Sequence, residues 1–193
     1  MSQNHINLQK ASDELVLAIW QGNIDKVKGF IAVGADVNAK GKNPSCSHRV
    51  NQNSIAKFTK STLETPLNMA ILNGSLPIAA LLCDNGAQAT KNSLSYAVSF
   101  NRFAIVDFLI ERGAQPDAKM LFSTSLDSSG EKMVLLLLER GVDPMAKNYG
   151  GMDIFTYMDQ EDPHFTAADH ERMIMKVMRQ RKRAARGPMP TIS

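Results

Sequence analysis

Four short phrases recur along the chain, and their spacing limits the folds that it can adopt. Each phrase opens with a glycine that closes an apolar segment, and these glycines are Gly34, Gly86, Gly113 and Gly141. Sixteen residues before each glycine stands a small residue, and three positions earlier stands a large apolar one. Self-similarity of this kind is typical of proteins that stack one small structural unit repeatedly.

The shared positions predict two short antiparallel helices in each repeat. A large and a small residue three positions apart lie on one face of the first helix. The four pairs are Leu15 with Ala18, Leu67 with Ala70, Leu94 with Ala97, and Phe122 with Ser125. A residue with positive φ is expected to end the first helix at Gly22, Gly74 and Asn101, a position that Ser129 holds in the fourth repeat. Neither helix buries its apolar face alone, so neighbouring repeats must stack.

The second repeat resembles the ankyrin-repeat family most closely. It reads Thr65-Pro66-Leu67-Asn68-Met69-Ala70, followed by Gly74, Leu81-Leu82 and Gly86-Ala87. Asn68 replaces the histidine that the family has after the leucine. The resemblance extends from Ser12 to Met158. It implies an all-α, ankyrin-type helical solenoid of stacked antiparallel helix pairs, which here would end in a C-terminal capping helix.

The pattern divides the chain into segments of unequal length. They are an N-terminal lead-in (1–11), repeat 1 (12–38), an inserted basic loop (39–63), repeat 2 (64–90), repeat 3 (91–117), repeat 4 (118–147), a degenerate repeat with the capping helix (148–184) and a flexible tail (185–193). Successive closing glycines are 52, 27 and 28 residues apart, whereas a regular ankyrin repeat has about 33. The third and fourth repeats are therefore expected to lack most of the family's β-hairpin finger.

Composition is that of a folded protein, with 44% hydrophobic and 21% charged residues. The net charge of +3 hides a basic C-terminal run from Lys176 onward, so the rest of the chain is close to neutral. This balance argues against nucleic acid as the partner, and no apolar run is long enough for a membrane span. Two cysteines and a polar N-terminus favour the cytoplasm, or delivery into a host cell for a bacterial effector.

No catalytic or cofactor-binding motif is found in the sequence, so we expect a protein that is not an enzyme and uses no cofactor or metal. The alternative is an enzyme or metal-dependent protein whose site combines the insertion and the C-terminal segment. Its candidate residues are Cys46, His48, His164 and His170. Cys83 follows Leu82 on a second helix, where a partly buried packing role is expected.

The resemblance also implies a set of partner-binding residues. In the family, the second and third residues after the alanine of the first helix vary and contact the partner. These positions are Trp20, Gln21, Leu72, Asn73, Ser99, Phe100, Asp127 and Ser128. Large aromatic side chains dominate binding hot spots, which favours a concave contact surface. The alternative is that Trp20 packs against the lead-in and Phe100 under the shortened junction.

The sequence is compatible with more than one role for each of two basic segments. The insertion carries Lys40, Lys42, Arg49, Lys57 and Lys60 without an acid, and it either steers an acidic partner or serves as a solvated spacer. The basic C-terminal run has three interpretations. Its cations stabilise the C-terminal end of a helix through the helix dipole, or it forms a nuclear-localisation signal or a patch that binds anionic surfaces, or it is a disordered recognition arm.

These observations predict a non-catalytic module that is monomeric alone and binds another protein through its concave face, as an enzyme inhibitor or a bacterial effector. An adaptor for anionic surfaces or nucleic acid, acting through the basic tail, is a further alternative.

Overall fold

The computed structural model describes residues 3–42, 63–124 and 128–161, together with the single helical positions 172, 175 and 179. The chain divides into two compact units, Met1–Ala114 (unit 1) and Gln115–Ser193 (unit 2). Helices dominate both units, so the predicted all-α helical repeat fold is confirmed. In the part of the chain that is described, no helix is both long enough and apolar enough to cross a membrane.

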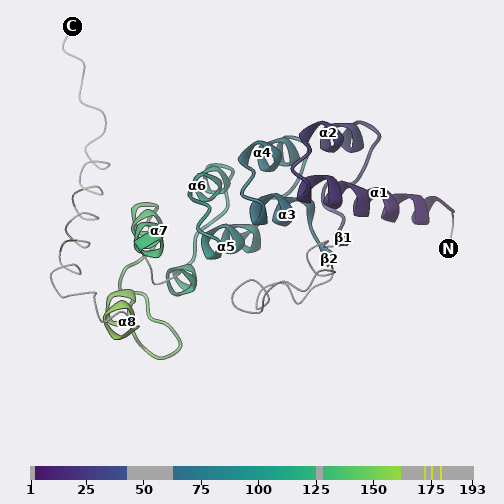
Figure 1. Ribbon diagram of the computed structural model, residues 1–193. Coiled ribbons are helices and arrows are strands. Elements are labelled where there is room, and N and C mark those ends of the chain that lie inside the picture. The colour runs from purple at the N-terminus through teal and green to yellow at the C-terminus, as the bar shows by residue number, and fades with distance from the viewer. Residues whose placement is uncertain are drawn as a thin grey trace, which may run out of the picture. The chain divides into compact units, whose positions relative to one another are not determined.

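Unit 1 stacks successive helix pairs in two rows (Figure 1). The inner row holds the first helix of each pair, and the outer row holds the second. The inner helices are α1 (Gln3–Trp20), α3 (Pro66–Leu72) and α5 (Lys91–Ser99), and the outer helices are α2 (Ile24–Ala32), α4 (Leu76–Asp84) and α6 (Phe103–Glu111). Each inner helix packs against the next, so the inner row presents a continuous wall.

The core of unit 1 lies where the repeating apolar positions meet. Leu15 and Leu94 are fully buried, and the small side chains of Ala70 and Ala97 have no exposed surface. Alanine at these positions lets the backbones of adjacent inner helices approach closely, because no large side chain separates them. The large and small positions identified in the first three repeats therefore form the packing surface between repeats.

The turns of unit 1 follow the predicted left-handed positions. Gly22, Gly74 and Asn101 have φ values of 68°, 69° and 52°, and they end the inner helices. The closing glycines of the outer helices also have positive φ. At Gly86 the amide donates to the Cys83 carbonyl and the Ala87 amide donates to the Leu82 carbonyl, at 3.1 and 2.9 Å. This is a Schellman ending, which satisfies two terminal carbonyls of α4.

The N-terminal lead-in is not a separate segment, because α1 is continuous from Gln3 to Trp20. A helix of this length is about 27 Å long. Trp20 stands at its C-terminal end and residues 3–11 form the opposite end. The alternative in which Trp20 packs against the lead-in is therefore wrong.

The first junction keeps the base of a β-hairpin finger. Strand β1 (Gly41–Lys42) pairs antiparallel with β2 (Leu63–Glu64), and Gly41 lies opposite Glu64. The insertion therefore begins and ends in paired strands, which the prediction of a plain loop over 39–63 did not include. Residues 43–62 lie outside the described part. The connections 85–90 and 112–117 contain no strand.

Unit 2 departs from the predicted repeat at its first helix. Residues Ala118–Ser123 form a 3₁₀ helix, η2, in place of an α-helix. With about three residues per turn, its buried face falls on Met120 and Leu121, and the predicted anchor Phe122 is only partly buried. The Phe122 and Tyr157 rings form a T-shaped pair, with 5.6 Å between their centroids.

The remaining elements of unit 2 are α7 (Ser128–Glu139) and α8 (Ile154–Glu161). Ser129 lies inside α7, so it does not end a first helix as its position in the repeat predicted. The degenerate helix expected around Ile154 and Phe155 is present, and both side chains are buried. The predicted capping helix lies outside the described residues except for three helical positions, 172, 175 and 179.

A glycine with positive φ and a glycine inside a helix allow a matched test of the turn geometry in unit 1. Gly86 has a φ of 93° and Gly29 lies inside α2, and an added Cβ would meet no atom within 4 Å at either site. We expect Gly86→Ala to lower the free energy of unfolding by about 1–2 kcal/mol through backbone strain. Gly29→Ala should raise it by about 0.5–1 kcal/mol, because alanine loses less entropy in a helix.

Urea unfolding followed by circular dichroism measures both changes. Equal effects of the two substitutions would contradict the left-handed ending at Gly86.

Candidate functional site

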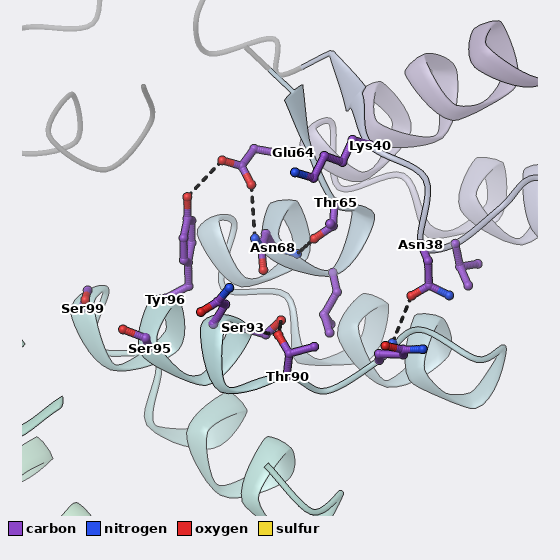
Figure 2. Close-up of a pocket in the computed structure, with 14 residues that line it drawn as sticks. Asn38, Lys40, Glu64, Thr65, Asn68, Thr90, Ser93, Ser95, Tyr96 and Ser99 are labelled. Atoms are coloured by element: carbon purple, nitrogen blue, oxygen red, sulfur yellow. Dashed lines mark hydrogen bonds between the residues drawn. The ribbon is translucent and has the colours of Figure 1, made fainter. Parts of the chain in front are cut away.

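A groove of about 530 Å³ lies on the inner side of unit 1, between the hairpin base and the helices α3 and α5 (Figure 2). Val37 and Leu67 contribute apolar side chains, and Lys40, Glu64 and Tyr96 contribute ionisable groups. The other lining side chains carry hydroxyl or amide groups: Asn38, Thr65, Asn68, Gln88, Thr90, Asn92, Ser93, Ser95 and Ser99. Such a lining is suited to forming hydrogen bonds with a polar chain.

Glu64 is the central charged group of this groove, although it is only 4% exposed. Its Oε1 accepts a hydrogen bond from the Tyr96 hydroxyl at 3.0 Å, and its Oε2 accepts one from Asn68 Nδ2 at 3.2 Å. Figure 2 shows the carboxylate spanning the space between these two side chains, which come from α5 and α3. The pKa of the Tyr96 phenol rises to about 12, mainly through burial and further through its bond to Glu64.

The rest of the groove is fixed by helix caps and a cross-link between repeats. Thr65 Oγ1 accepts from the Asn68 amide, and Thr90 Oγ1 accepts from the Ser93 amide, both at 3.2 Å. These are N-caps of α3 and α5. Asn38 donates to the Gly86 carbonyl and accepts from the Gln88 amide, at 3.0 and 3.1 Å. The hydroxyl and amide groups are therefore held in place before any ligand binds.

The predicted contact residues occupy a different part of the inner wall. Trp20, Leu72 and Phe100 lie at the C-terminal ends of α1, α3 and α5, and Trp20 is 43% exposed. Leu72 and Phe100 are partly buried, and the Phe100 ring lies 6.1 Å from that of Tyr96. Among the predicted residues that are described, Ser99 and Lys40 line the groove.

Gln21 lines a second groove of about 430 Å³ with Leu17, Phe30 and Val33 of the first repeat. Ser128 begins α7, and Asp127 lies outside the described residues. Gln21 is therefore not among the residues that line the polar groove, and Ser128 belongs to unit 2.

Asn73 has a structural role that sequence reasoning did not identify. Its Nδ2 donates to the carbonyls of Ile19 and Trp20, at 2.7 and 2.9 Å. Arg102 does the same one repeat later, where it donates to the carbonyls of Ile71 and Leu72 at 3.3 and 2.6 Å. Each side chain donates to two carbonyls at the end of the preceding inner helix. Of these, the Ile19 and Ile71 carbonyls also accept from the amides of Gly22 and Gly74. These bonds fix the spacing of the inner helices.

The residues of the enzyme or metal alternative, Cys46, His48, His164 and His170, lie outside the described part. Within the described part, no group of three or more histidine, cysteine or carboxylate side chains is placed to hold a metal ion. Of the basic set, Lys42 lies in β1, and Arg49, Lys57 and Lys60 are outside the described residues. Cys83 is a partly buried free cysteine, and burial raises the pKa of its thiol.

A model of the family described as "Ankyrin repeats (3 copies)" matches residues 15–120. This range contains the inner helices α3 and α5 and all the residues that line the groove, Glu64 among them. No curated protein matches the chain.

The Glu64–Tyr96 contact predicts how stability changes at high pH. The phenol has an ordinary pKa of 10.0 and one of about 12 in the folded chain. Between these values the folded chain holds a proton that the unfolded chain releases, so the free energy of unfolding falls as pH rises.

Tyr96→Phe should make this fall shallower over the same range. Urea unfolding at a series of pH values measures it, and phenolate absorbance follows the ionisation directly. Identical slopes for wild type and Tyr96→Phe would contradict the assigned contact.

Proposed function

The chain belongs to the ankyrin-repeat family, and we propose that it binds another protein through the polar groove of unit 1. Ankyrin repeats generally mediate interactions between proteins. The observation that carries the proposal is the groove of about 530 Å³, whose walls come from the hairpin base and two inner helices. Its exposed amide side chains, such as Gln88 and Asn92, are available to a ligand.

We place the centre of the interface in the groove and its edge at the C-terminal ends of the inner helices. Trp20 is the most exposed large side chain of that edge. A half-exposed tryptophan offers contact area at a small entropic cost, which favours its use in binding. Leu72 and Phe100 support the same edge as partly buried neighbours, while Asn73 contributes through its bonds to α1.

The proposed role is non-catalytic and needs no cofactor. It is supported by the usual role of the family and by the lack of catalytic motifs in the sequence. Inhibition of an enzyme and action as a bacterial effector in a host cell both agree with a small binding module. We propose that the protein is a monomer when alone and acts in a cytoplasm, and the identity of the partner distinguishes the two roles.

Steering of an acidic partner by the basic insertion remains part of the proposal. Lys40 contributes an exposed positive charge beside the groove. A cation at the edge of a binding site increases the rate of encounter with an acidic surface, and this effect weakens with salt. The alternative, in which the insertion is a solvated spacer, predicts association rates that do not change when Lys40 and the other basic residues of the insertion are replaced.

A pair of tyrosine substitutions tests the groove. Ser95 lines the groove on α5, and Ala104 is an exposed residue of α6 in the outer row. We expect Ser95→Tyr to weaken partner binding by about tenfold or more, because the added ring fills space that the partner needs. Ala104→Tyr adds the same ring to the outer row and should leave binding unchanged.

The partner is first captured with wild-type protein and identified by mass spectrometry, and the affinities of purified variants are then measured by biolayer interferometry. Full affinity in a folded Ser95→Tyr variant would reject the groove. Trp20→Ala tests the edge separately, and unchanged affinity there would remove the edge from the interface.

A further inference from the structure

We infer that the groove takes a lysine or arginine side chain of the partner, with the Glu64 carboxylate as its counter-charge. This inference rests on the proposed function, since it names the chemistry of the segment that would lie in the groove. It depends on how Glu64 is fixed, on the charges around it and on the acceptors that line the groove.

Glu64 is held in one position from three sides. On the backbone, β2 pairs with β1, and Glu64 lies opposite Gly41. Strand β1 is pressed against α1, since a Cβ on Gly41 would lie 2.5 Å from the Ser12 carbonyl oxygen. On the side chain, Tyr96 and Asn68 each donate to one carboxylate oxygen. A carboxylate fixed in this way does not need to be ordered when a ligand binds.

The hydrogen bonds that hold Glu64 come from neutral groups. Both donors are uncharged, and no ion pair joins Glu64 to a cation in the described ranges. Lys40 lines the same groove beside Glu64, with an exposed side chain (Figure 2). A carboxylate that is removed from water loses hydration, and two neutral hydrogen bonds compensate only part of this loss. A bound cation would supply the rest.

Other groups on the walls also lack donors. The buried Oδ1 of Asn68 and the buried Oγ of Ser99 have no hydrogen-bond partner. Both residues line the groove, and Figure 2 shows them on either side of Tyr96. An ionised carboxylate has about four acceptor positions, of which two are used here. An ammonium brings three donors and a guanidinium five, whereas an acidic side chain would add only acceptors.

The test uses small probes, so the partner need not be known. Nuclear magnetic resonance follows wild-type backbone amides during titration with Nα-acetyl-lysine methylamide and Nα-acetyl-arginine methylamide. The matching norleucine and glutamate derivatives serve as controls. We expect saturable shifts at Asn68 and Tyr96 with one or both cationic probes, in the millimolar range, and weaker or no binding of the controls.

Glu64→Gln keeps the size of the side chain and removes its charge, and it should weaken the cationic probe by about tenfold. Ala104→Tyr, on the outer row, lies outside the groove and should retain binding. If Glu64→Gln does not fold, the comparison of lysine with norleucine on wild type and Ala104→Tyr decides. Equal binding of these two probes, or unchanged lysine binding by folded Glu64→Gln, would overturn the inference.

The failure of this inference is distinguishable from failure of the proposed function. If the captured partner binds Glu64→Gln as tightly as wild type but loses affinity for Ser95→Tyr, the groove stands and the cation site does not. If Ser95→Tyr also binds fully, the groove itself is rejected.

Discussion

The close packing of the inner helices determines the rest of unit 1. Ala70 and Ala97 are fully buried at the positions where α3 and α5 meet their neighbours. A larger residue there would separate the helices, because a packed interior has no space for added atoms. With the helices this close, side chains such as Asn68 and Tyr96 are carried on adjacent backbones and share one carboxylate. The site is thus a consequence of packing between repeats.

The spacing is reinforced by polar bonds as well as apolar contact. Asn73 and Arg102 each reach back to two carbonyls at the end of the preceding inner helix. Carbonyls at the end of a helix have spare acceptor capacity, and an additional donor stabilises them. Asn73 was expected to face a partner, as ankyrin contact residues do. At Asn73 the amide group bonds within the stack, which supports the proposal of a binding surface nearer the hairpin base.

Local pattern was enough to predict the helix pairs and their turns, because the signals lie within one repeat. Gly74, Asn101 and Gly86 were identified from spacing alone, and each has positive φ. The groove could not be found this way, since Glu64 and Tyr96 are 32 residues apart and meet only after two repeats have stacked. Glu64 directly precedes Thr65 and could be noted in the sequence as a candidate site residue, but nothing in the sequence showed that it is buried. Phe122 failed as an anchor, since its segment forms a 3₁₀ helix in which Met120 and Leu121 are the buried residues.

Net charge is a poor guide to what this groove binds. The insertion between repeats 1 and 2 is basic, which by itself suggests an acidic partner. Exposed lysines act at long range and through solvent, so they affect mainly the rate of encounter. Glu64 is buried, and at short range in a less polar environment one carboxylate interacts more strongly than several solvated lysines. The charge that matters for the proposed ligand is therefore the buried one, Glu64, which lines the groove with both oxygens held by neutral donors.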